Sequence, residues 1–152
     1  MSTHIKPETL ASIGGLSMTP GAPGDSVLLM IDGQREYTTG RLPLAGVDAA
    51  VEEGARLLAF AREQRMPVFH AIHHSRPGAA LFDPLCVSAS ARSALDHGFR
   101  STVVAGATAT RDLPNPSGKG VTMAETIQQG TLAALSDRFS AVIADTYTLS
   151  LK

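Results

Sequence analysis

The sequence has little cysteine, little net charge and no long apolar run. Cys86 is the single cysteine among 152 residues, so an internal disulfide is excluded and a reducing cytoplasm is the expected location. A net charge of −1 provides no basic surface, so we expect neither nucleic acid nor a membrane as a partner. No apolar run approaches the ~20 residues of a membrane span. The N-terminus also lacks the order of a signal peptide.

What is present is the composition of one globular domain. Hydrophobic residues make up 43% of the chain and charged residues 18%, which excludes a disordered protein. Residues 1–25 are rich in Gly, Pro, Ser and Thr and are expected to form an N-terminal arm. Residues 26–152 are expected to form the domain.

The first elements of that domain are a strand and a helix. The apolar run 26–31 (SVLLMI) ends at Asp32 and is typical of a strand buried on both faces of a parallel sheet. Residues 47–64 have helical spacing. The inward stripe is formed by Val47, Val51, Leu57, Leu58 and Ala61, and the charged residues Glu52, Glu53, Arg56 and Arg62 are expected largely off it.

The rest of the domain continues the same alternation. Further strands are predicted over 68–72, 102–105 and 141–144, and further helices over 86–97 and 122–139. Gly98 is well placed to end the helix 86–97. Alternating strands and amphipathic helices predict an α/β fold of three layers, a Rossmann-like parallel sheet with helices on both faces.

Two residues lie where catalytic groups collect in such folds. Asp32 follows the first strand, and ligands bind beyond the carboxyl ends of parallel strands; alternatively, it is a turn-forming Asp before Gly33. Cys86 begins a helix, where free N–H groups and the helix dipole favour a thiolate; alternatively, it is a small buried apolar residue. Together they indicate covalent catalysis, because a base that takes the thiol proton makes the nucleophile.

Three stretches resemble the isochorismatase-like cysteine hydrolases. VLLMIDGQREY (27–37) is similar to their first strand and Asp-x-Gln signature. LCVSASARSALDHGFRSTVVAGATATRDLP (85–114) is similar to their nucleophile region, and AETIQQGTLAALSDRFSAVI (124–143) to their closing helix and strand. The resemblance covers most of residues 26–145.

The resemblance implies roles for matching residues. Asp32 would be the general base and Cys86 the nucleophile that attacks an electrophilic carbon. The backbone N–H groups of Leu85 and Cys86 would form the oxyanion hole. Such donors contribute ~3–4 kcal/mol of transition-state stabilisation. The resemblance also implies a homo-oligomer.

The family's catalytic lysine has no counterpart here. The chain contains Lys6, Lys119 and Lys152, and none lies between Asp32 and Cys86, where the resemblance places it. Lys119 lies in PNPSGKG, a composition typical of a solvated loop. Between Asp32 and Cys86 the resemblance implies a strand with the lysine, a helix and another strand that enters the sheet beside the first one. Such a unit takes about 30 residues, but only residues 73–85 separate the second strand from Cys86. We therefore predict a gap near 84–85, with one such unit missing.

Two explanations of the gap remain: residues lost from the sequence as written, or a genuine deletion. A deletion would leave unpaired backbone groups in mid-sheet, each costing about 1–3 kcal/mol against a total stability of about 5–15 kcal/mol. The first explanation is favoured on that ground. A genuine deletion would need a rearranged sheet or a partner strand, and we would expect such a protein to be inactive.

Other residues are candidates for the substrate pocket. They share a position near the end of the first or second strand, and are Gln34, Tyr37, His73, His74 and Phe82. A structural role for the histidines is an equal alternative. Some relatives in the resembled family hold a metal with an Asp-x-His pattern and another His. No Asp-x-His-Pro-like motif follows Asp32 here, so no metal is expected. No other cofactor is expected either.

The sequence therefore predicts a cysteine-dependent hydrolase of a small amide or related C–N substrate. One alternative is isochorismate-type vinyl ether cleavage, which in the family does not need the cysteine. Another is a catalytically inactive oligomerisation or binding module with the same fold. The substrate itself is not identifiable from these residues.

Overall fold

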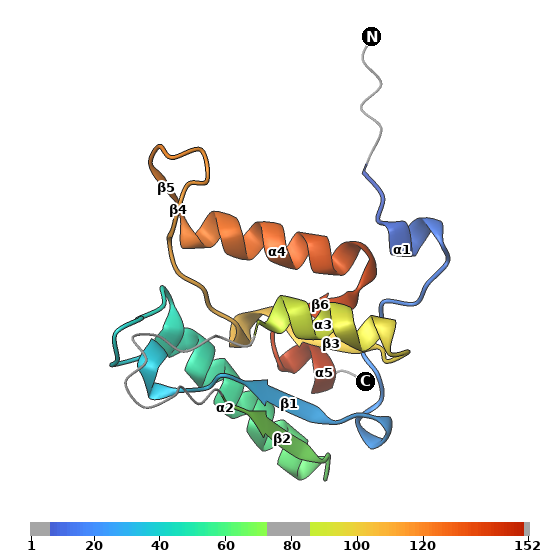
Figure 1. Cartoon of the computed structure of the whole chain (residues 1–152). Coiled ribbons are helices and arrows are strands. Elements are labelled where there is room, and N and C mark those ends of the chain that lie inside the picture. Colours follow the sequence, from blue (N-terminus) through green and yellow to red (C-terminus); the bar gives the residue numbers. More distant parts are fainter. Residues whose placement is uncertain (1–6, 73–85, 151–152) are drawn as a thin grey trace.

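The computed structural model describes residues 7–72 and 86–150 of the chain (Figure 1). The helices are α1 (Leu10–Ile13), α2 (Val47–Glu63), α3 (Val87–Asp96), α4 (Ala124–Arg138) and α5 (Tyr147–Ser150). The strands are β1 (Leu28–Ile31), β2 (Val68–Ala71), β3 (Ser101–Val104), β4 (Leu113–Pro114), β5 (Val121–Thr122) and β6 (Ser140–Ile143). Short 3-10 helices are η1 (Pro23–Asp25), η2 (Arg35–Tyr37) and η3 (Ala105–Ala107).

The predicted strands and helices are confirmed to within about two residues. The short elements α1, α5, β4 and β5 were not predicted, because four-residue helices and two-residue strands carry too little periodicity to be recognised. Gly98 has a φ of 81° after α3, as expected of the residue that ends a helix. Within the described residues, no helix combines the length and apolar composition needed to cross a membrane.

The main strands pair in parallel, and helices cover both faces of the β3–β6 pair. β1 pairs with β2, and β3 pairs with β6. In Figure 1, α3 and α4 lie on one side of the strands, and α2 and α5 on the other. The predicted α/β fold with a three-layer arrangement is therefore confirmed.

Alternate side chains of β3 and β6 form two hydrophobic cores. Val104 and Ile143 pack with Leu28 of β1 and with Leu57 and Ala61 of α2. Their neighbours face the other way: Val103 packs with Ala91 of α3 and Leu135 of α4, and Val142 lies against the same cluster. Because successive strand residues point to opposite faces, two short strands hold both helix layers.

The parallel strands are divided between two sheets. The amides of Leu28 and Asp32 donate to Pro67 and Ala71, each at 2.9 Å. The alternate peptide groups of Leu29 and Ile31 therefore point to the opposite edge of β1. Among residues 7–72 and 86–150, no strand pairs with that edge, and β3 belongs to the other sheet.

The open edge of β1 is where the missing strand was expected. On the adjoining face, Leu29 is 49% exposed and Phe69 is 57% exposed, although parallel sheets are ordinarily covered on both faces. The predicted junction at 84–85 lies outside the described residues. The gap therefore stays a prediction, and the divided sheet agrees with it.

The expected N-terminal arm contains an anchored turn of helix. Ala11 of α1 is fully buried, and the amide of Leu10 donates to an oxygen of Asp137 in α4 at 2.8 Å. The Thr9 side chain caps α1 by accepting from the amide of Ser12 at 3.0 Å. This contact attaches residues 9–13 to the helix layer formed by α4.

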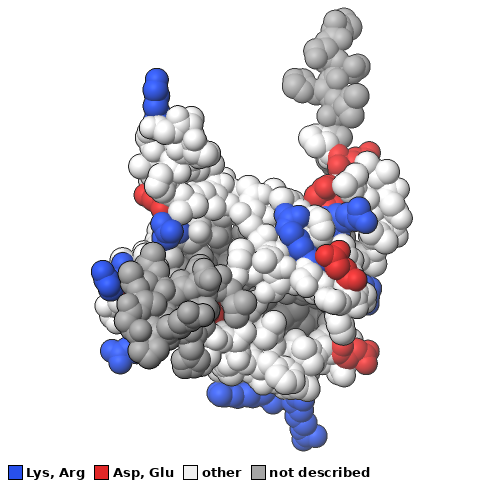
Figure 2. Space-filling view, viewed as in Figure 1, with Lys and Arg blue, Asp and Glu red and all other residues white. Residues whose placement is uncertain are grey.

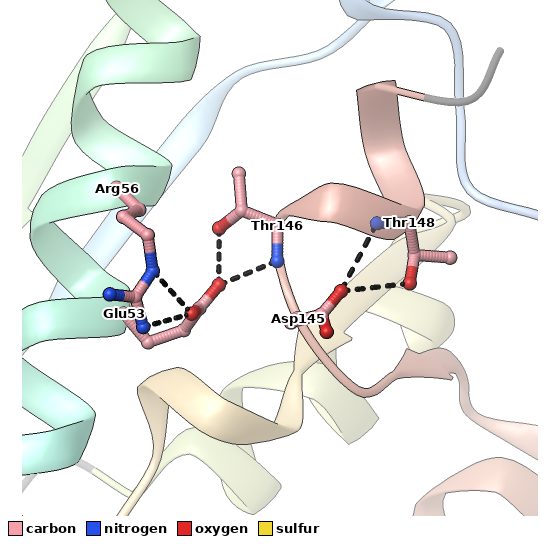
Figure 3. A network of polar contacts seen from close by, with 5 residues as sticks. All are labelled: Glu53, Arg56, Asp145, Thr146 and Thr148. Carbon is pink, nitrogen blue, oxygen red and sulfur yellow. Dashed lines mark hydrogen bonds and ion pairs between the residues drawn. The ribbon is translucent and has the colours of Figure 1, made fainter.

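Two expectations for α2 were wrong. Val51, expected to face inward, is 55% exposed, whereas Glu53, expected off the inward stripe, is only 5% exposed. The cause lies in the tertiary structure, because Glu53 points at the segment after β6 (Figure 3). Helical periodicity cannot reveal a polar partner that is distant in the sequence.

Glu53 joins α2 to the β6–α5 connection. Its Oε1 accepts from both the backbone amide and the hydroxyl of Thr146, and its Oε2 accepts from Arg56 Nε at 2.8 Å and Nη2 at 2.6 Å. The Thr146 hydroxyl is the chief cause that holds the pKa of Glu53 below its ordinary 4.5, against the effect of burial. Gly106 lies so close to the end of β6 that a Cβ atom at position 106 would be 2.9 Å from the Ala144 carbonyl oxygen.

We predict that Glu53→Gln lowers the free energy of unfolding by about 1–2 kcal/mol at pH 7, because the charged acceptor for Thr146 and Arg56 is lost. Glu52→Gln, an exposed neighbour on α2, should change stability by less than about 0.5 kcal/mol. Urea unfolding measures both.

The destabilisation by Glu53→Gln should depend on pH. A carboxyl whose folded-state pKa is lowered contributes stability above its unfolded-state pKa and loses it as pH falls toward the folded-state value. The difference between wild type and Glu53→Gln should therefore be full above about pH 5 and shrink at lower pH. A difference that is equal at pH 7 and at about pH 3 would contradict this assignment.

Candidate active site

One side of the molecule combines strand ends and helix beginnings. The carboxyl ends of β1 and β3 and the first turns of α2, α3 and α4 lie toward the left in Figure 1. Ligands of α/β proteins bind at this edge, because loops there converge and helix N–H groups are unpaired. Asp32 and Cys86 belong to this edge by sequence, since one follows β1 and the other precedes α3.

Asp32 has an unusual backbone and a buried side chain. Its φ of 53° is one of two positive values at non-glycine residues in the described chain. The amide of Gln34 donates to the Asp32 carbonyl at 2.7 Å, and the side chain is 9% exposed. Such a conformation costs about 1–3 kcal/mol and concentrates at functional sites. The interpretation of Asp32 as a plain turn residue does not account for its burial.

The two oxygens of Asp32 differ in their surroundings. Oδ2 accepts a hydrogen bond from the Tyr37 hydroxyl at 3.5 Å. Oδ1 is buried and has no hydrogen-bond partner among the described residues. A buried oxygen without a partner costs about 1–3 kcal/mol, and such an atom calls for an explanation such as a catalytic role.

The same contact changes the acidity of Tyr37. Burial, together with the charge of Asp32 and its hydrogen bond, raises the pKa of Tyr37 to about 12. Glu36 adds to the rise, and Arg111 opposes it. Tyr37 therefore stays protonated at neutral pH and acts toward Asp32 as a donor.

Cys86 is an exposed thiol at the start of α3. Its backbone is extended, with φ −92° and ψ 126°, and its carbonyl accepts the first helical bond from Ser90 at 3.0 Å. Cys86 is therefore the N-cap of a ten-residue helix, as the sequence predicted. The alternative of a buried apolar cysteine is wrong, because the residue is exposed.

The other sequence-predicted residues fall into two groups. Gln34 and Tyr37 lie in the turn after Asp32, both partly buried, and the Tyr37 amide donates to the Gln34 carbonyl at 3.2 Å. His73, His74, Phe82 and Leu85 lie outside the described residues, so their predicted roles stay predictions. Lys119 is exposed in the turn between β4 and β5, in agreement with the expected solvated loop.

The structure also contains a cavity of about 310 Å³ that the sequence did not predict. It is formed by the first turns of α2 and α4 and the η3 loop, and Asp32, Tyr37 and Cys86 are not among its lining residues. Most lining residues are small: Ala45, Gly46, Ala49, Ala50, Gly106, Thr108, Ala109, Thr110, Ala124, Glu125 and Gln128.

The face of the molecule drawn in Figure 2 has no large charged patch among the described residues. Figure 2 shows basic and acidic side chains in small separate groups, with most of the described surface uncharged. Among the described residues, no group of three His, Cys, Asp or Glu side chains could hold a metal ion. The features that stand out are the buried carboxylate and the exposed thiol.

Comparison with known proteins identifies the relatives of this fold. An isochorismatase from Pseudomonas putida KT2440 has 30% sequence identity and a TM-score of 0.83, over 95% of this chain and 100% of that one. A cysteine hydrolase from Pseudomonas syringae pv. phaseolicola 1448A shares the fold at a TM-score of 0.74, with 15% identity over 95% and 96% of the two chains.

A curated relative matches a shorter stretch. The secreted isochorismatase effector Isc1 of Verticillium dahliae is 34% identical over 71 residues, which are 47% of this chain and 37% of that protein. The match thus spans little more than a third of the curated relative. No protein-family model matches the chain. The fold, and the 30% identity across the whole Pseudomonas putida protein, show that this chain belongs to the isochorismatase-like hydrolase family.

Proposed function

We propose that this protein hydrolyses a small amide or related C–N bond through a covalent thioester on Cys86, with Asp32 as the general base. Asp32 takes the thiol proton, and the thiolate adds to the substrate carbonyl carbon. The C–N bond then breaks, and the amine leaves with the proton that Asp32 returns. Water, deprotonated by Asp32, hydrolyses the thioester and regenerates the thiol.

The observation that carries this proposal is the buried carboxylate of Asp32, whose backbone has a positive φ and whose Oδ1 has no hydrogen-bond partner among the described residues. A buried carboxylate oxygen without a hydrogen-bond partner among the described residues is suited to accept a proton. A purely structural Asp would be expected to use both oxygens.

Cys86 supports the proposal through exposure and location. It is the chain's single cysteine, it is exposed, and it lies at the N-cap position of α3. An exposed thiol gains little from packing, so a chemical role explains it better than a structural one.

The main alternative is cleavage of a vinyl ether such as isochorismate. Two proteins with sequence similarity are named isochorismatases, which favours this alternative. The reaction in the family does not need the cysteine, so dependence on Cys86 separates the two functions. A third outcome, an inactive module, would agree with the absent lysine and the open edge of β1.

We predict that Cys86→Ala lowers kcat/KM for amide substrates by about 1,000-fold or more, because no thioester can form. The assay is a panel of small amides, ureido compounds and isochorismate, with release of amine or pyruvate as the readout. If the Cys86→Ala variant still hydrolyses an amide, the thiol mechanism is wrong. If it still cleaves isochorismate, the vinyl ether reaction is established.

We also predict that iodoacetamide modifies one thiol per folded chain at neutral pH without denaturant, because Cys86 is exposed. Intact-mass measurement reports the added group, and the Cys86→Ala variant is the unlabelled control. Labelling that requires denaturant would contradict the exposed position of the thiol.

The location and assembly of the protein remain proposals. We propose a cytoplasmic homo-oligomer that acts on a small molecule without a cofactor. We expect light scattering on the purified chain to give a mass of at least twice 15.9 kDa. A monomer of that mass would contradict the proposed assembly, and an intact mass above 15.9 kDa would reveal a segment beyond the present sequence.

A further inference from the structure

We propose that Tyr37 is the positioning residue of Asp32: its hydroxyl holds Oδ2 and thereby leaves Oδ1 as the oxygen that exchanges the proton. This inference rests on the proposed role of Asp32 as the general base. From the sequence, Tyr37 was expected only to line the substrate pocket. The contact gives Tyr37 a role toward Asp32 and gives the two carboxylate oxygens different roles.

The backbone between the two residues fixes the contact. The amide of Gln34 donates to the Asp32 carbonyl at 2.7 Å, and the amide of Tyr37 donates to the Gln34 carbonyl at 3.2 Å. The Tyr37 carbonyl in turn accepts from the amide of Leu44 at 3.1 Å. The η2 turn is thus bonded before and after Tyr37, and the ring is directed back toward the end of β1.

The two oxygens of Asp32 then have different tasks. A carboxylate with both oxygens in equivalent surroundings can rotate and present either one. The Tyr37 hydroxyl removes this equivalence, because it donates to Oδ2, whereas Oδ1 is buried and has no partner among the described residues. A base is efficient only when the accepting atom is held within reach of the proton it takes.

Burial and the charges around the phenol make Tyr37 a stable donor. Burial is the largest cause that disfavours its ionisation, Asp32 and Glu36 add to it, and Arg111 opposes them, so the pKa of Tyr37 lies at about 12. A phenol that does not ionise near neutral pH can hold the carboxylate throughout the working range without competing for its proton.

The first test compares Tyr37→Phe with Tyr147→Phe. Tyr147 is the chain's other tyrosine and is 69% exposed on α5, so it controls for the loss of a hydroxyl. We expect Tyr37→Phe to lower kcat by about 5- to 20-fold while KM changes by less than about 2-fold. Tyr147→Phe should change neither.

The pH profile separates positioning from a structural effect. A donated hydrogen bond favours the charged carboxylate. Without it, protons compete for Asp32 more strongly, so the acidic limb of the kcat/KM profile should move to higher pH in Tyr37→Phe. A variant with a uniformly lower rate and an unmoved acidic limb would overturn the proposal.

The second test reports the contact without any turnover. In the Tyr147→Phe background, 3-fluorotyrosine labels position 37 alone, and fluorine lowers the phenol pKa into a range where the folded protein can be titrated by 19F NMR. Asp32→Asn should lower the titration midpoint clearly, since both a charge and an acceptor are changed. Glu36→Gln removes one nearby charge of the same sign and should lower the midpoint less.

The two tests distinguish failure of this inference from failure of the proposed function. If Asp32→Asn and Glu36→Gln move the midpoint equally, or neither does, Tyr37 does not hold Asp32, whatever the activity. If the midpoint responds to Asp32→Asn as expected while Cys86→Ala leaves amide turnover intact, the thiol mechanism fails and the Tyr37–Asp32 contact stands.

Discussion

The pairing of β3 with β6 is the contact on which the rest of the structure depends. Val103 and Val142 face the layer of α3 and α4, whereas Val104 and Ile143 face α2. Two adjacent strands therefore supply both hydrophobic cores, and each helix layer is attached through them. A strand pair buried on both faces cannot shift its register by one residue without exchanging the two cores. This constraint fixes where η3 and the beginning of α4 meet α2.

Buried hydrogen bonds fix the position of α2 relative to the segment after β6. Glu53 of α2 holds the segment after β6 through Thr146, and Gly106 permits the close approach of that segment. These contacts join α2 to β6 on the side opposite α3 and α4. The edge that carries Asp32 and Cys86 is consequently built on elements whose relative positions are set by both apolar packing and buried hydrogen bonds.

The site itself shows a contrast between its two principal residues. Asp32 is buried, has a positive φ, and has a described hydrogen-bond partner for only one of its two carboxylate oxygens. Cys86, in contrast, is exposed at the start of a helix. That contrast suits a base that must be oriented and a nucleophile that must be reached. The open edge of β1 among the described residues, and the exposed Leu29 and Phe69, agree with the prediction that a strand is missing beside β1. The absent lysine was predicted for the same region, which gives one explanation for both observations.

Local sequence by itself determined the α/β class, the main strands and helices, and the positions of Asp32 and Cys86 at element boundaries. Apolar runs and helical spacing are local properties, and both residues border such elements. Only the tertiary structure decided that Glu53 is buried and Val51 exposed, that the four parallel strands divide into two sheets, and that Tyr37 contacts Asp32. Each of these depends on segments that meet in space, such as Glu53 with Thr146 across 93 positions, or on the path of a turn. Hydrophobic periodicity shows which face of its own helix or strand a residue occupies. It does not show which distant residue that face meets, or the path of a turn.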